Sequence, residues 1–188
     1  MSTTIQELIT DLKNKDDKVR GPAWQDAGKF GAVAVKPLVE TMTDPDYEVA
    51  RAAKRALWRV VRQAGRPPAK AEAEAVVAQF LPLLASGAAP VRRELLWMLS
   101  EIAGDEAVSP MAALLLDPEA REDARCALLR IPSGKVTAAL KTAMSTAPEE
   151  FKPNLAEALR TRGEQIEGYP SQKRVPSKPT GVKMMGAN

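Results

Sequence analysis

The sequence predicts an all-α fold, a right-handed α-solenoid of about five helical hairpins followed by an extended C-terminal tail. Two observations support this class. Similar segments recur along the chain, each with apolar residues at helical spacing. Aromatic residues make up only 4% of the composition, whereas alanine and leucine are frequent, which favours helices packed closely on helices. A chain of 188 residues is long enough for one short repeat array with its own core.

The second helix of each hairpin is identified by a shared apolar stripe. The stripe starts at Val19, Val49, Val91, Ala120 and Phe151. Four positions later come Ala23, Ala53, Leu95, Ala124 and Leu155, and eight positions later come Ala27, Leu57, Leu99, Leu128 and Leu159. These spacings lie on one face of an α-helix. Because many of these residues are small, we expect the stripes to pack closely on the partner helix and on the neighbouring repeats.

A shorter apolar segment precedes each stripe and predicts the first helix of the hairpin. The five segments are residues 4–12, 34–42, 75–86, 107–116 and 135–144. Thr4 and Glu7 have the spacing of a capping box, which marks the start of the first of these helices. Asp-Pro pairs at residues 44–45 and 117–118 predict turns within hairpins, because proline cannot continue the preceding helix. The longer interval between the second and third copies predicts an insertion at residues 65–73.

One segment shows the repeat most completely. LSEIAGDEAVSPMAALLLDPEAREDARCAL, residues 99–128, contains a glycine-acid turn, a Val-x-Pro first helix, an Asp-Pro turn and an Arg-x-x-Ala second helix. This pattern resembles the HEAT repeat, in the short form of the phycobilisome-lyase-like branch, and residues 34–57 follow it nearly as well. The resemblance covers roughly residues 5–163. It implies a scaffold or adaptor more often than an enzyme, and function must be argued from the site.

The composition excludes several kinds of chemistry. Histidine is absent and Cys126 is the only cysteine, so there is no disulfide framework, no cysteine-built metal site and no histidine-activated nucleophile. We therefore expect no catalytic residue, metal or cofactor, and interpret Cys126 as inert. Asp26 occupies an apolar position of the stripe, and we interpret it as a polar cap of the terminal repeat rather than a catalytic carboxylate. Arg92 and Asp123 lie on facing flanks of neighbouring repeats and are predicted to form an ion pair.

Three tryptophans predict a binding surface. At about 100° per residue, Trp24, Trp58 and Trp97 point well away from the apolar stripes of their helices. In HEAT-like solenoids the second helices line the concave surface, so the resemblance places these rings at a groove. The other expected groove residues are Arg51, Lys54, Arg55, Arg93, Leu96, Arg125 and Leu129. Large aromatic rings beside arginines are typical of binding hot spots. Sideways packing against the next repeat and simple surface exposure stay open as alternatives.

The chain divides into residues 1–164, the solenoid, and residues 165–188, a tail containing proline and glycine that we expect to be extended or disordered unless bound. The tail carries four basic residues and one acidic residue, whereas residues 1–164 carry equal numbers of both, so the net charge of +3 belongs to the tail. Its expected docking residues are Tyr169, Lys173, Arg174, Val175, Lys178, Val182, Lys183, Met184 and Met185. Apolar anchors among positive charges suit an acidic surface on a partner. The alternative is that the tail stays in solvent and binds nothing.

These observations predict a non-enzymatic adaptor, scaffold or assembly subunit that binds another protein through the groove and the tail, with the two contacts adding avidity. Nucleic-acid binding is the second hypothesis, because HEAT-like alkylpurine DNA glycosylases also place tryptophans, arginines and an aspartate on a concave face. A chromophore-lyase subunit is the third, by resemblance to the phycobilisome branch. The N-terminus lacks the pattern of a signal peptide, and no apolar run reaches the length of a membrane span. We therefore expect a cytoplasmic protein.

Overall fold

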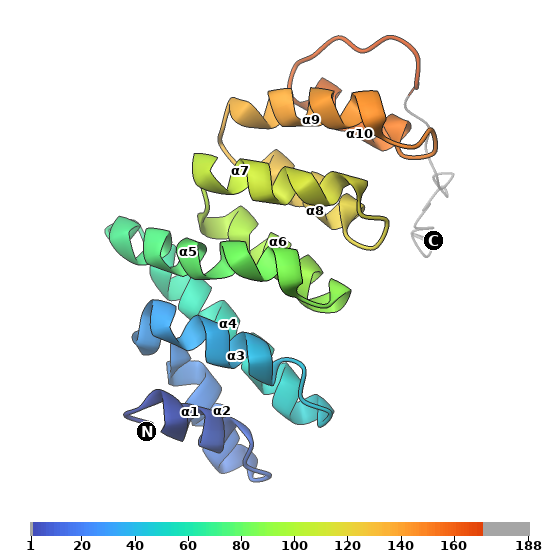
Figure 1. Cartoon of the computed structure of the whole chain (residues 1–188). Helices are drawn as coiled ribbons and strands as arrows, with labels where there is room; N and C mark the ends of the chain where they lie inside the picture. Colours follow the sequence, from blue (N-terminus) through green and yellow to red (C-terminus); the bar gives the residue numbers. More distant parts are fainter. Residues whose placement is uncertain (1, 171–188) are drawn as a thin grey trace, which may run out of the picture.

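The structure is a computed structural model that describes residues 2–170. Throughout this range the regular structure is helical, with no strand, and successive helical hairpins stack along one axis (Figure 1). The N-terminal hairpin lies at one end of the stack and the C-terminal hairpin at the other. The predicted all-α solenoid of five hairpins is therefore confirmed.

The five hairpins follow one another in chain order. Their helices are α1 (Ile5–Leu12) with α2 (Asp17–Asp26), α3 (Val35–Thr41) with α4 (Tyr47–Ala64), α5 (Lys70–Ser86) with α6 (Ala89–Ile102), α7 (Asp105–Ala112) with α8 (Arg121–Arg130), and α9 (Lys135–Thr146) with α10 (Lys152–Thr161). Two 3-10 segments, η1 (Ala27–Ala34) and η2 (Ala113–Leu116), extend α2 and α7. Each second helix packs on its own first helix and on the second helix of the next repeat.

The apolar stripes form the core, as the sequence predicts. All fifteen stripe residues are buried except Val19, which is half-buried. Val19 belongs to the terminal hairpin, whose outer side has no neighbouring repeat to cover it. The small residues of α4 are fully enclosed, since Ala53 and Ala56 have no exposed surface. The short side chains let α4 lie close to the helices on both of its sides.

Local capping explains where the helices begin. The Thr4 hydroxyl accepts a hydrogen bond from the Glu7 amide at 3.1 Å, and the Glu7 carboxylate accepts one from the Thr4 amide at 3.2 Å, so the predicted capping box is confirmed. The hydrogen bonds from Thr3 and Thr4 lower the pKa of Glu7. Asp46 begins α4 in a similar way, because its carboxylate accepts a hydrogen bond from the Glu48 amide at 2.9 Å.

Residues 65–73, where the sequence predicts an insertion, are a loop in their first part and helical in their second. Helix α5 already begins at Lys70, so residues 70–73 are helical and the connection is residues 65–69. The additional residues lengthen the helices instead, giving 18 residues in α4 and 17 in α5. Alanines and glutamates dominate residues 69–75, and both are strong helix formers, which explains the difference. An ion pair of 2.8 Å between Arg66 and Glu72 spans the connection.

Two glycines allow the first two repeats to approach each other. Gly31 has a φ of 57° and kinks the chain within η1, four residues before α3 begins. Gly28 lies against α4, where an added Cβ would be 3.0 Å from the backbone oxygen of Arg59 and 3.1 Å from Cβ of Gln63. This close contact brings the end of α2, with Trp24, beside the middle of α4.

Candidate partner-binding face

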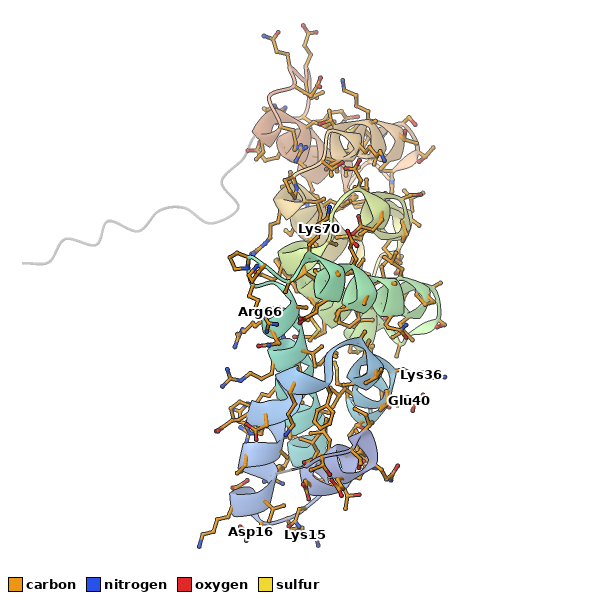
Figure 2. The ribbon with its side chains drawn as sticks, turned by 90° about the vertical axis from the view of Figure 1, so that its left-hand side faces the viewer. Lys15, Asp16, Lys36, Glu40, Arg66 and Lys70 are labelled. Atoms are coloured by element: carbon orange, nitrogen blue, oxygen red, sulfur yellow. The ribbon has the colours of Figure 1, made fainter. Side chains whose placement is uncertain are left out.

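The second helices share one side of the molecule. In Figure 1, α1, α3, α5, α7 and α9 lie in front, and their partners α2, α4, α6, α8 and α10 lie behind them. Figure 2 shows the two sides in profile, with Lys36 and Glu40 of α3 projecting to one side and Arg66, just after α4, on the opposite side. We call the outward surface of α2, α4, α6, α8 and α10 the second-helix face. The tryptophans predicted to border a groove all belong to these helices.

The tryptophans are half-buried and bridge neighbouring repeats. The indole N–H of Trp58 donates a hydrogen bond to the Glu94 carboxylate at 2.6 Å, which joins α4 to α6. The indole N–H of Trp97 donates to the Asp123 carboxylate at 2.8 Å, which joins α6 to α8. Trp24 packs partly against the core. These contacts agree with the sideways-packing alternative, but each ring keeps an exposed part that a partner could cover.

Most basic side chains predicted for the groove have an acidic partner. Arg51 pairs with Glu48 on its own helix. Lys54 lies 3.5 Å from Glu94, and Arg93 lies 2.6 Å from Asp123, so both ion pairs cross between repeats. Arg125 contacts both carboxylate oxygens of Glu122, and this contact raises the pKa of the Arg125 guanidinium. The charges of this part of the face are therefore largely neutralised within the molecule.

The middle of α4 differs from this pattern. The side chains of Arg55, Arg59 and Arg62 are exposed and make no ion pair or hydrogen bond with any residue between 2 and 170. Arg55 and Arg59 instead lie over the ring of Trp24, with Cζ 5.4 Å and 5.7 Å from the ring centroid. Arg62 lies over the ring of Trp58, with Cζ 5.7 Å from the centroid. Of these three arginines, only Arg55 was predicted from the sequence as a groove residue.

Two sequence predictions are corrected by the structure. Leu96 is fully buried in the core and has no surface to offer a partner, because a second helix inside the stack is covered on its flanks as well as on its stripe. Leu129 is half-buried against the same core. Arg92 does not pair with Asp123. It lies 2.5 Å from Asp117 in the turn before α8, while Asp123 pairs with Arg93.

Cys126 lies on the second-helix face and is half-buried. Burial raises the pKa of its thiol, and the nearby Glu122 and Asp123 carboxylates act in the same direction. The Arg125 guanidinium, 3.1 Å from the sulfur, opposes these effects without reversing them. A thiol held in its neutral form is a poor nucleophile, which agrees with the interpretation of Cys126 as inert.

The first residues of the predicted tail contact α10. Ile166 packs on the core, and the Arg160 guanidinium donates hydrogen bonds to the backbone oxygens of Gly168 and Tyr169 at 3.0 and 2.7 Å. The Tyr169 hydroxyl donates to the Glu149 carboxylate at 3.1 Å. Lys152 and Tyr169 together lower the pKa of Glu149. The other predicted docking residues, from Lys173 to Met185, lie outside the described part of the chain.

A hollow that the sequence analysis did not anticipate lies among the first helices. It has a volume of about 550 Å³ and lies between α7 and α9, with Ala112, Ala139 and Ala143 among its lining residues. The small side chains at facing positions do not fill the space between the two helices. Asp105 and Lys135, which form an ion pair of 3.0 Å, also line the hollow. A second hollow of about 450 Å³ lies beside η1, and Lys29 and Phe30 line it.

Within residues 2–170 there is no group of three or more histidine, cysteine, aspartate or glutamate side chains that could hold a metal ion. Among the helices of the same range, none is both long enough and apolar enough to cross a membrane.

Comparisons with known proteins add little to this description. No protein-family model matches the sequence, and no curated protein matches it. Among solved structures, an engineered protein of the Northeast Structural Genomics Consortium is 25% identical with a TM-score of 0.42, covering 86% of this chain and 79% of its own. A designed armadillo repeat protein in complex with the peptide (KR)4 is 22% identical with a TM-score of 0.46, covering 82% of this chain and 80% of its own. TM-scores below 0.5 carry no conclusion about function, so the second-helix face has to be interpreted from its own side chains.

Proposed function

We propose that this chain is a non-enzymatic protein-binding scaffold, an adaptor or assembly subunit, that holds its partner on the second-helix face. The observation that carries the proposal is the row of unpaired, exposed arginines beside half-exposed tryptophans on α2 and α4. Tryptophan and arginine are the residue types most enriched at binding hot spots, since they combine a large contact area with hydrogen bonding. A stacked array of hairpins offers a rigid surface, which reduces the entropy lost on binding.

The proposal extends to the type of repeat and to the domain division. We assign the repeats to the HEAT type, supported by Gly104 and Asp105 at the start of α7, Pro110 within it, and the Asp117 turn before α8. Residues 1–164 form the binding scaffold and residues 165–188 form a basic segment that makes a second, weaker attachment. Two weak attachments on one chain raise the overall affinity without either contact being tight.

Site-specific photo-crosslinking in the source cells tests the proposed face. A photoreactive amino acid replaces Lys54 or Arg93 on the second-helix face in one set of variants, and Lys36 or Glu40 of α3 in the matched set. All four side chains are exposed, so none of the replacements removes a core contact. The expected result is protein adducts from positions 54 and 93 but not from 36 and 40.

Three outcomes would overturn the proposal. Adducts confined to positions 36 and 40 would move the binding surface to the first helices. Adducts that consist of nucleic acid would favour the second hypothesis of the sequence analysis. Absence of adducts from all four positions would reject a partner-binding scaffold.

A further inference from the structure

The four arginines of α4 and Arg66, just after the helix, form one row. Arg51, Arg55, Arg59, Arg62 and Arg66 follow one another at intervals of four, four, three and four residues. At 100° per residue the four positions within α4, from Arg51 to Arg62, fall within about 80° of one another around the helix axis, and Arg66 follows just after the helix ends at Ala64. At 1.5 Å per residue the part of the row within α4 is about 16 Å long. We call these five residues the arginine row.

The two ends of the arginine row are neutralised, whereas its centre is not. Arg51 pairs with Glu48, and Arg66 lies 2.8 Å from Glu72. The central residues Arg55, Arg59 and Arg62 find no acidic partner in the described part of the chain. Arginines on α6 and α8 differ in this respect, because all of them have acidic partners. These are the carboxylates described above and, for Arg121 and Arg130, Glu150 and Glu101.

The central arginines are held in place by the tryptophans. Each guanidinium carbon lies within 6 Å of a ring centroid, a distance at which the ring attracts the cation. Trp24 is itself fixed against the core, and Trp58 is fixed by its hydrogen bond to Glu94. A guanidinium restrained in this way loses less conformational entropy when it binds an anion. The guanidinium N–H groups that point away from the ring have no acceptor within residues 2–170, so they can donate hydrogen bonds to a ligand.

The spacing of the row fits an extended peptide. Neighbouring arginines are separated by about 4.5 or 6 Å along the helix axis, and alternate side chains of an extended strand are about 6.6 Å apart. Arginine binds carboxylates through two parallel hydrogen bonds. From this geometry, and resting on the proposed function, we propose that the arginine row binds an extended acidic segment of the partner protein, with carboxylates at alternate positions.

The surroundings of the row favour a peptide over a nucleic acid. Residues 1–164 carry equal numbers of acidic and basic side chains, so this part of the chain has no net positive charge to attract a phosphate backbone. The carboxylates of Glu48 and Glu94 lie beside the row, on α4 and α6 respectively. They would repel a polyanion that continued across the neighbouring helices. A short acidic peptide bound to Arg55, Arg59 and Arg62 would reach neither Glu48, seven residues before Arg55 on the same helix, nor α6.

Fluorescence anisotropy with defined probes tests the inference on the full chain. The probes are a labelled (Glu-Ser)6 peptide, a labelled (Lys-Ser)6 peptide and a labelled single-stranded DNA of twelve thymidines, all at the same salt concentration. The test variant is Arg55→Ala/Arg59→Ala/Arg62→Ala. The matched control is Arg93→Ala/Arg125→Ala/Arg130→Ala, which removes the same charge from the same face but only from arginines that have acidic partners. A second variant, Arg55→Lys/Arg59→Lys/Arg62→Lys, keeps the three positive charges but cannot form the two parallel hydrogen bonds of a guanidinium.

We expect (Glu-Ser)6 to bind the wild-type chain and (Lys-Ser)6 not to bind. The alanine variant of the row should lose about tenfold or more in affinity, since three exposed pairs are removed, while the control loses less than about threefold. The lysine variant should fall between the wild type and the alanine variant, and it serves as the test if the alanine variant does not fold. Equal losses in the row and control variants, or tighter binding of the DNA than of (Glu-Ser)6, would overturn the inference.

The two proposals can fail separately. If photo-crosslinks at Lys54 and Arg93 capture a protein but (Glu-Ser)6 does not bind, the scaffold proposal stands and the acidic-peptide inference is rejected. If neither crosslinks nor peptide binding are found, both are rejected.

Discussion

The burial of Leu96 leads to a prediction that separates the structure from the sequence interpretation. Replacing Leu96 by alanine removes three carbon atoms from a site with no solvent exposure. At about 0.8 kcal/mol per buried carbon, the lost transfer free energy is about 2.4 kcal/mol. The cavity left behind adds to this, so we expect the free energy of unfolding to fall by about 3 kcal/mol. If Leu96 lay on the surface, the same replacement would change the free energy of unfolding by less than about 0.5 kcal/mol.

Urea unfolding followed by circular dichroism measures this difference. With a slope between about 1 and 3 kcal/mol/M, a loss of 3 kcal/mol moves the midpoint by roughly 1 M or more. Leu129→Ala is the matched control, because Leu129 is only half-buried on the next second helix, and its loss should be about half as large. A midpoint for Leu96→Ala within 0.2 M of the wild type would refute the packing described for α6.

Further predictions concern four single residues. Trp97→Phe keeps an aromatic ring but removes the donor to Asp123, so the free energy of unfolding should fall by about 1 kcal/mol in urea titrations. Gly21 has nothing within 4 Å of an added Cβ, and Gly21→Ala should raise the melting temperature by removing helix-interior flexibility. Gly28→Ala meets the α4 backbone at 3.0 Å and should lower the melting temperature; the opposite order of the two variants would contradict the close contact. Because burial raises the pKa of Cys126, iodoacetamide should alkylate it more slowly at pH 8 in the folded chain than in urea, and equal rates would contradict that burial.

The repeat architecture could be predicted because it depends on residue spacing within single helices. The stripe residues are buried wherever a neighbouring repeat exists to cover them, and the capping box at Thr4 is a local device of four residues. Such features are encoded in short segments, and stacking then follows from the need to cover each apolar stripe. The spacing of the repeats predicted an insertion at residues 65–73 without indicating its structure, and its alanines and glutamates extend α5.

The candidate face could be predicted only in part because contacts between repeats are not encoded in one helix. Helical angles show that Leu96 and Trp97 both point away from the stripe, yet they do not show that the next repeat covers Leu96 completely and Trp97 partly. The partner of Arg92 depends similarly on where the Asp117 turn lies relative to α6. The spacing of Arg59 and Arg62 with Arg55 was readable from the sequence, and the signal was the interval of four and three residues. Their lack of acidic partners required the structure.

The most direct test of a binding surface on α2 and α4 uses the indole signals of the three tryptophans in a ¹⁵N-labelled chain. Titration with (Glu-Ser)6 should shift the signals of Trp24 and Trp58, whose rings lie beneath the central arginines. The signal of Trp97, whose N–H is held by Asp123 away from the row, should stay unchanged. Peptide binding that left the Trp24 and Trp58 signals unmoved, or that shifted Trp97 alone, would contradict the account.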